Sequence, residues 1–310
     1  AALAIAVQTV SGAALAQQQV ALGSSGSGTG PYINGAQMAE AANGVQDAWR
    51  FSVQTTGGYR DNMGLVLSRD LDIALTTLID LEFAVNGRGD FASLPGREDL
   101  RLVFTFGAVP QNLFVREDSG ITALDGIQGQ RFNINSPASF THALNLRMLE
   151  AVGIALDSFE AGTVPTGQVF DQVQNGVFEG GAHVFQLGLG GMQRLASSVP
   201  MRFLDVPEPV FTALNAGYFG LLVPYTVPAG TYQGQDADVS TFGLAQVVFA
   251  HKDADPDMVY ALTRGFWENL ASLQASNTSF NGMTPELGAA PYGMTLHPGA
   301  ARYFAEVGAQ

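Results

Sequence analysis

Short apolar runs alternate with segments of helical spacing along the first part of this chain. The runs 20–22 and 71–75 are bounded by small and polar residues, as strands are. Between them, residues 31–42 carry apolar side chains at helical spacing, and Pro31 is a favoured first-turn residue behind Thr29 and Gly30. Strands that alternate with helices predict βαβ units and largely parallel sheets, which is an α/β fold.

The same strand, polar loop and helix occur twice. Residues 20–30 form an apolar run and a small-residue loop before one helix, and residues 132–141 do so before a later helix. A second unit, in which a polar loop precedes a helix and then a strand, spans 51–75 and is repeated at 159–185. Two similar modules predict two similar lobes whose helix N-termini face each other, a geometry suited to clamping a small anion.

Two longer apolar stretches are candidates for strands that cross between the lobes. Residues 101–116 are interrupted by Gly107 and Pro110, and residues 239–250 are broken at Gly243. Two crossings make the first lobe discontinuous. The predicted boundaries are 18–108 with 243–310 for lobe 1, and 109–242 for lobe 2.

Composition supports two lobes and excludes several classes of function. The chain has 310 residues of which 46% are hydrophobic, more than one core usually organises. A formal net charge of -14 excludes nucleic acid as a partner, because phosphate binding requires clustered Lys and Arg. The absence of cysteine excludes disulfides, thiolate metal sites and cysteine nucleophiles.

The N-terminal segment predicts the location of the protein. Residues 1–16 are small and apolar and end in Ala14-Leu15-Ala16, as the apolar region and cleavage site of a secretory signal peptide do. The alternative is a hydrophobic N-terminal helix. No later stretch reaches the roughly 18 apolar residues that span a bilayer. We expect an exported protein that starts near Gln17 and is not itself embedded in the membrane.

The repeated loops supply candidate ligand-binding groups. Ser25 and Thr29 precede the first helix, and Ser136, Ser139 and Thr141 accompany the later one. Such loops expose backbone N–H groups, and the helix dipole adds partial positive charge, so a carboxylate or phosphate is attracted. The alternative is that these residues only cap their helices, but their repetition in both halves favours binding. No Gly-Lys-Ser/Thr follows, so this is not a P-loop.

A sharper candidate site follows the strand that begins at Phe51. Thr56, Gly57 and Gly58 end that strand with hydroxyl and N–H donors, at the sheet edge where open α/β sheets bind ligands. Tyr59 can stack on a ligand or bond to it, and Arg60 can pair with a carboxylate through two hydrogen bonds. An ordinary exposed helix arginine is the alternative for Arg60.

No pattern in the chain predicts catalysis, a metal site or a cofactor. The four histidines have no metal-ligand spacing, and no Gly-x-Ser-x-Gly turn is present. His183 lies in an apolar strand and is expected to be packed or at the edge of the cleft. Four aromatic residues, Tyr32, Phe140, Tyr218 and Phe219, are candidates to cover the cleft, although a core position is favoured for the two phenylalanines.

Several segments resemble one family of transport proteins. Residues 259–269 and 296–308 resemble the closing signature of the TAXI family, the extracytoplasmic solute receptors of tripartite ATP-independent periplasmic (TRAP) transporters. Residues 56–62 resemble its Thr-Gly-Gly-Ser-x-x-Asn turn, residues 118–131 its segment leading into lobe two, and residues 229–235 its loop before the second crossover. The resemblance extends over most of the mature chain.

The resemblance implies a type II periplasmic binding protein fold: two Rossmann-like lobes joined by two crossover strands, with a ligand cleft between them. It implies a periplasmic receptor of the Gram-negative type with no enzyme activity. Such a receptor captures a small organic anion, such as glutamate or 2-oxoglutarate, and delivers it to an integral-membrane TRAP permease driven by an ion gradient. The alternative is a cytoplasmic ligand-sensing effector domain of the same fold, which the export-like N-terminus disfavours.

The sequence departs from the family pattern where the cleft is expected. Tyr59 replaces the serine of Thr-Gly-Gly-Ser, residues 136–141 replace a Gly-Ser-Gly-Thr-like loop, and 186–192 replace a Gly-x-Pro motif. Specificity is therefore expected to differ from that of glutamate-binding relatives. The predicted ligand-binding set is Ser25, Thr29, Tyr32, Thr56, Gly57, Gly58, Tyr59, Arg60, Ser136, Ser139, Thr141 and Gln186.

Overall fold

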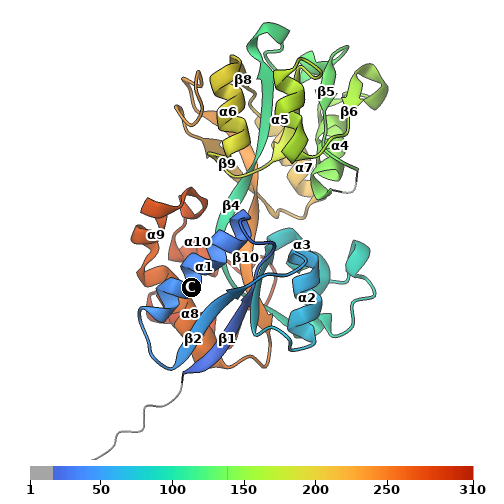
Figure 1. The fold of residues 1–310 in the computed structure, drawn as a ribbon. Coiled ribbons are helices and arrows are strands. Elements are labelled where there is room, and N and C mark those ends of the chain that lie inside the picture. Colours follow the sequence, from blue (N-terminus) through green and yellow to red (C-terminus); the bar gives the residue numbers. More distant parts are fainter. Residues whose placement is uncertain (1–16, 138, 310) are drawn as a thin grey trace, which may run out of the picture.

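The computed structural model describes residues 17–137 and 139–309, and the predicted signal peptide at 1–16 lies outside them. Figure 1 shows two groups of helices and strands, which we call lobe 1 and lobe 2, joined by the long strands β4 (Leu100–Arg116) and β10 (Val239–His251). The chain builds most of lobe 1, enters lobe 2 along β4 and returns along β10.

The elements follow the predicted alternation of strands and helices. Lobe 1 begins with β1 (Gln18–Gly23), α1 (Gly30–Asn43), β2 (Trp49–Gln54), α2 (Tyr59–Leu67), β3 (Ile73–Thr77), α3 (Leu78–Val85), η1 (Gly89–Phe91) and η2 (Arg97–Asp99). Lobe 2 contains η3 (Glu117–Ser119), η4 (Leu124–Ile127), β5 (Arg131–Asn133), α4 (Phe140–Val152), η5 (Leu156–Ser158), β6 (Glu160–Gly162), α5 (Thr166–Gln174), β7 (Gly180–Val184), α6 (Gly190–Ser198), β8 (Met201–Phe203), α7 (Glu208–Gly217) and β9 (Leu222–Val227). Lobe 1 is completed by α8 (Pro256–Glu268), α9 (Leu270–Ser276), η6 (Thr278–Phe280), α10 (Pro285–Ala289) and α11 (Pro298–Glu306).

Each lobe has a core of parallel strands closed by a crossing strand. The strand order is β2-β1-β3-β10-β4-β7-β5-β6, with β8 paired to β4 and β9 to β10. β1, β2 and β3 are parallel, as are β5, β6 and β7, whereas β10 and β4 run antiparallel to their neighbours. The repeat in the sequence therefore corresponds to a repeat in topology, with β5, β6 and β7 in the places of β1, β2 and β3.

The strand registers make the two carboxyl edges face each other. Thr77, at the carboxyl end of β3, pairs with Gln246 of β10, which pairs with Gly107 of β4. Val184, at the carboxyl end of β7, pairs with Gln111 of β4. Four positions of an extended strand span about 13 Å. The loops after the parallel strands of both lobes therefore meet at the junction.

β4 and β10 cover the two predicted crossing segments. β4 pairs with β10 from Leu100 to Pro110 and with β7 from Gln111 to Val115, so its change of partner falls beside the predicted boundary at 108/109. The other predicted boundary, 242/243, falls inside β10. We keep these lobe boundaries as a proposal.

An aromatic cluster forms the centre of lobe 1. The Phe104 and Phe266 rings stack with centroids 5.0 Å apart, and Phe266 meets Trp267 and Phe280 edge-on at 4.9 and 5.4 Å. Phe104, Phe266 and Phe280 are fully buried. These rings join β4 to α8 and η6, so the C-terminal helices are part of the core of lobe 1.

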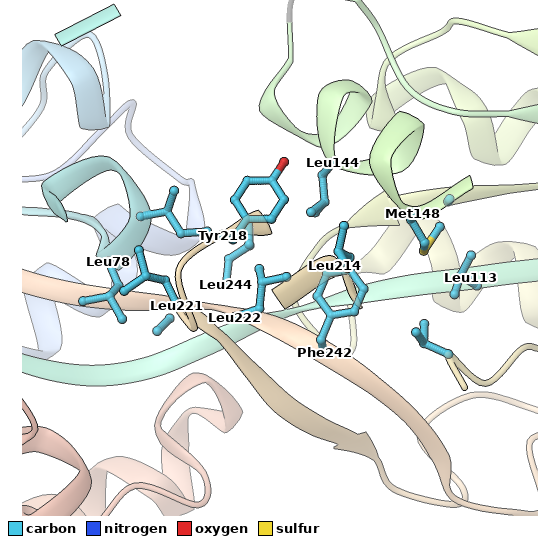
Figure 2. Close-up of a cluster of buried hydrophobic side chains, with 14 of the residues drawn as sticks. Leu78, Leu113, Leu144, Met148, Leu214, Tyr218, Leu221, Leu222, Phe242 and Leu244 are labelled. Carbon is cyan, nitrogen blue, oxygen red and sulfur yellow. The ribbon is translucent and has the colours of Figure 1, made fainter. Parts of the chain in front are cut away.

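A second apolar cluster continues through the junction. Figure 2 shows Leu78 of α3 beside Leu221 and Leu222, with Leu244 and Phe242 of β10 along the same path toward lobe 2. Tyr218, a predicted cleft cover, is 4% exposed and belongs to this core, where Phe140 packs edge-on against it. The prediction that Tyr218 covers the cleft was wrong, because its ring is buried in this cluster. Phe140 packs against the same cluster, which is the core position favoured for it.

Phe219, the other predicted cleft cover besides Tyr32, makes a separate contact between the lobes. It lies between α7 and β9 with a left-handed φ of 57°, and its side chain is 54% exposed. The Arg88 guanidinium of lobe 1 lies 3.8 Å from its ring centroid, and Phe83 of α3 meets the ring edge-on. This cation–π contact ties the α7–β9 turn to lobe 1.

Candidate functional site

The loop between β1 and α1 uses its hydroxyl protons internally. The Thr29 hydroxyl donates to Gly26 O at 2.7 Å and accepts from Tyr32 N, so Thr29 is the N-cap of α1. Since the proton of Thr29 is committed, the Ser25 hydroxyl is the donor in the 2.6 Å bond between the two oxygens. In this conformation both side chains stabilise the loop and offer no proton to a ligand.

The loop after β2 is braced in the same way. The Thr56 hydroxyl donates to Ser24 O at 3.1 Å and accepts from Gly58 N at 3.2 Å, and Gly57 N donates to the Asp61 carboxylate at 3.1 Å. Gly58 has φ 120° and ψ -171°, a conformation that requires glycine. These predicted donors therefore shape the edge of lobe 1 rather than project hydrogen atoms from it.

Tyr59 belongs to a buried amide network that the sequence did not reveal. Its hydroxyl accepts from Gln246 Nε2 at 2.6 Å, and Gln246 Oε1 accepts from Asn34 Nδ2 at 3.3 Å. Asn34 Oδ1 then accepts from Asn277 Nδ2 at 2.8 Å. Burial and the nearby Asp80 carboxylate raise the pKa of Tyr59, so it remains a neutral phenol. The network joins α1, α2 and β10 to the C-terminal segment.

Arg60 is exposed at the start of α2, with its guanidinium 5.6 Å from the ring centroid of Phe91. Phe91 is a buried residue of lobe 1. The structure therefore places the charge of Arg60 beside an aromatic ring of its own lobe, and its role as a carboxylate partner stays a prediction.

In lobe 2, His183 is the centre of a buried network at the ends of the parallel strands. Asn135 N donates to Asn133 Oδ1 at 2.9 Å, so that oxygen is an acceptor and His183 Nε2, 2.8 Å from it, carries the proton. His183 Nδ1 then accepts from the Thr166 hydroxyl at 2.9 Å. Burial lowers the pKa of His183 to about 3, which keeps the ring neutral. His183 is thus packed, as the sequence predicted.

The same network holds the loop before α4. Asn135 has a left-handed φ of 72°, and its Oδ1 accepts from Ser136 N at 2.7 Å. The Ser139 hydroxyl donates to Ser136 O at 2.7 Å and accepts from His142 N, so Ser139 is the N-cap of α4.

Among the described residues, the hydroxyls of Tyr32, Ser136 and Thr141 form no hydrogen bond with one another or with any other group. These three remain able to donate to a ligand.

Two buried asparagines tie neighbouring strand ends together, one in each lobe. Asn62 Nδ2 donates to Ser24 O and to Leu75 O, both at 2.8 Å. Asn145 Nδ2 donates to Ile134 O at 3.1 Å and to Ala182 O at 2.7 Å. Both residues are fully buried. Each amide therefore fixes the end of a central strand, which keeps the facing loops rigid.

The electrostatics of the helix N-termini differ around the junction. α1, α4, α5 and α6 follow β1, β5, β6 and β7, and none of these four helices has an acidic residue in its first turn. In contrast, α2 has Asp61 and α3 has Asp80 in the first turn. Carboxylates there offset the partial positive charge of a helix N-terminus. Four helix ends around the junction keep that charge.

Gln186 is the predicted residue that reaches across to the other lobe. A Cβ placed on Gly30 would lie 2.5 Å from Gln186 Oε1 and 2.6 Å from its Cδ, closer than side-chain contacts occur. The amide of Gln186 therefore lies directly against the first residue of α1. Its Nε2 is buried and has no acceptor among the described residues.

The structure thus brings most of the predicted set to the facing edges of the two lobes. The sequence did not predict the side-chain amides of Asn34, Asn133, Asn135 and Gln246 as parts of the site. Asn133 and Asn135 flank Ile134 at the end of an apolar run, and that position in a predicted parallel strand was the available signal.

Within residues 17–137 and 139–309, no group of three or more His, Asp and Glu side chains could hold a metal ion. In the same described part of the chain, no helix combines the length and the apolar character needed to cross a bilayer.

Comparison with known proteins identifies related sequences and folds. A family model described as the NMT1-like family matches residues 20–308. The TctC solute binding protein from Polaromonas superposes with a TM-score of 0.54 at 12% identity, over 94% of this chain and 99% of that chain. The probable amino-acid ABC transporter extracellular-binding protein ytmK of Bacillus subtilis superposes with a TM-score of 0.54 at 11% identity, over 86% of this chain and 98% of that chain. The periplasmic aliphatic sulphonate binding protein SsuA of Escherichia coli superposes with a TM-score of 0.51 at 14% identity, over 93% of this chain and 83% of that chain. The predicted fold class is confirmed.

Proposed function

We propose that this chain, which belongs to the NMT1-like family, is an extracytoplasmic solute-binding protein that holds a small organic anion between its lobes. The observation that carries the proposal is that four helices, α1, α4, α5 and α6, begin after strands of the facing carboxyl edges and have no first-turn carboxylate. Backbone N–H groups and the helix dipole attract a carboxylate at such ends.

The neutral donors around the junction fit a ligand with further polar groups. The hydroxyls of Tyr32, Ser136 and Thr141 and the amide of Gln186 come from both lobes. A ligand that contacts both lobes favours their closed arrangement, because only that arrangement makes both sets of contacts. The protein's task is then to capture a solute and present it in a closed form.

The partner we propose is an integral-membrane TRAP permease driven by an ion gradient, with the chain as its periplasmic TAXI-type receptor. The resemblance of residues 56–62, 259–269 and 296–308 to that family supports this choice. The names of solute-binding proteins with a similar fold point to several import systems. Co-purification therefore tests the choice of a TRAP permease. A tagged chain is expected to co-purify with a membrane permease from solubilised membranes, and recovery of an ATPase-containing importer instead would contradict the TRAP assignment.

A thermal-shift screen tests the ligand class. Mono- and dicarboxylates, including glutamate and 2-oxoglutarate, are screened against the purified protein beside neutral sugars and cations. A ligand at 100 times its Kd adds about 2.7 kcal/mol of stability, which raises Tm by several degrees. We expect at least one organic anion to do so. A Tm raised only by sugars or cations would contradict the proposal.

Arg60→Gln tests the proposed counter-ion. If Arg60 pairs with the ligand carboxylate, removal of its charge is expected to weaken binding by about tenfold or more, measured by isothermal titration calorimetry. Arg264→Gln is the matched control, because Arg264 lies on α8 in the same lobe and is engaged with Glu268. Equal affinity of both variants would move the role to the neutral donors and helix N-termini.

A further inference from the structure

The contact between Gln186 and Gly30 joins the two lobes at the proposed anion site. Gln186 follows β7 in lobe 2, and Gly30 is the first residue of α1 in lobe 1. The side-chain amide occupies the space that a Cβ at position 30 would need. Only glycine permits this approach, because any other residue at this position would push the amide away.

Each partner in this contact is fixed to its own lobe. Asn112 Nδ2 donates to Phe185 O at 3.0 Å and to Pro110 O at 2.9 Å, which anchors the chain just before Gln186 to β4. The Phe185 ring is 5% exposed and packs edge-on against Phe114. On the other side, Thr29 caps α1, whose buried face packs in lobe 1. The two ends of the contact are therefore each held by their own lobe, and only the Gln186 side chain bridges the space between them.

The contact is incomplete as it stands. Gln186 Nε2 is buried without an acceptor among the described residues, and a buried amide N–H is almost always paired. It lies at the N-terminus of α1, where no first-turn carboxylate is present. An anionic oxygen bound there can accept from Gln186 and from the helix at once.

We infer that Gln186 couples ligand occupancy to closure of the lobes, as the group by which lobe 2 senses an anion held at the N-terminus of α1. This inference rests on the proposed function. Closure without ligand leaves the Nε2–H group unpaired, whereas closure on an anion pairs it. The anion therefore favours the closed arrangement through this amide, and Gly30 makes room for it.

Distance measurements between labelled lobes test the contact without any ligand. The chain has no cysteine, so Glu40→Cys in α1 and Ser197→Cys in α6, both exposed, give a double spin-label pair. A single Cβ at position 30 could be accommodated by rotation of the flexible Gln186 side chain, so a larger group is needed to test the contact. Gly30→Phe is expected to shift the label distances to longer values, because its ring fills the space that the Gln186 amide occupies between the lobes. Gly64→Phe is the matched control in α2, where a Cβ meets nothing within 4 Å, and it should reproduce the wild-type distances. Wild-type distances in Gly30→Phe would overturn the inference.

Gln186→Glu tests the coupling with a carboxylate built into the chain. The new carboxylate is attracted to the N-terminus of α1, so the variant is expected to have shorter and narrower label distances than the wild type in the absence of ligand. It should also bind anions more weakly, because its own carboxylate occupies their place. Distances equal to those of the ligand-free wild type would overturn the inference.

Gln186→Ala completes the test with 2-oxoglutarate as the anion in solution. Loss of one hydrogen bond to a charged group is expected to weaken its binding about tenfold, with the Tm of the ligand-free protein unchanged. Unchanged affinity overturns the inference while the receptor proposal stands. If no anion binds the wild type, the receptor proposal fails, and the ligand-free distances of Gly30→Phe and Gln186→Glu alone decide whether the contact controls closure.

Discussion

Phe266→Ala is expected to remove about 3–5 kcal/mol of the free energy of unfolding, because it empties the centre of the lobe 1 core. Phe266 is fully buried and contacts Phe104, Trp267 and Phe280 in the aromatic cluster of lobe 1. Its truncation leaves a cavity that three large rings cannot all move to fill, because each is also packed against β4 or the C-terminal helices.

Urea unfolding followed by tryptophan fluorescence measures this effect, since Trp267 lies beside the substituted ring. Leu156→Ala is the control: Leu156 is 51% exposed, so its truncation should change stability by no more than about 0.5 kcal/mol. A loss below about 1 kcal/mol for Phe266→Ala would mean that the cluster does not hold lobe 1 together.

The second large effect is a loss of stability in acid that depends on His183. Burial lowers the pKa of His183 from 6.5 to about 3, so below pH 6.5 the unfolded chain binds a proton that the folded protein does not. The free energy of unfolding therefore falls as pH falls, by about 1.4 kcal/mol per pH unit for this one group. Burial also lowers the pKa of His297, to about 4. This group therefore adds a further fall in the free energy of unfolding, over a narrower range of pH.

His183→Gln isolates this contribution. The glutamine amide can donate to Asn133 Oδ1 and accept from Thr166, as the ring does, but it takes up no proton. Relative to its own value at pH 7, the variant is expected to lose about 2.5 kcal/mol less than the wild type by pH 4.5, from urea unfolding at each pH. Parallel curves for the two proteins would show that His183 is protonated in the folded state.

The repeated modules could be predicted because their signals are local. Pro31 behind Thr29 marked a helix start, and the structure begins α1 at Gly30. The long apolar runs that contain Gly107 and Gly243 marked the crossings that β4 and β10 provide. Strand and cap preferences depend on a few adjacent residues, so one sequence is enough to find them.

The hydrogen bonding of the site could not be predicted in the same way. Ser25, Thr29 and Thr56 were correctly placed in edge loops, but their protons are used inside those loops, and residue type does not give the direction of a hydrogen bond. The amide network of Asn34 and Gln246 joins residues 212 positions apart. Such pairs are set by the tertiary fold, which periodicity along the chain does not specify.

The two long crossing strands also determine the order in which the protein can fold. β10 pairs with β3 and β4, yet the whole of lobe 2 lies between β4 and β10 along the chain. Pairing of β3 with β10 closes a long loop, and such non-local pairing is slow. An unpaired strand edge is prone to pair with other chains, so the folding protein carries an aggregation-prone β3 until β10 joins it. Lobe 2, an uninterrupted stretch that follows β4, can fold first and serve as the support on which lobe 1 is completed.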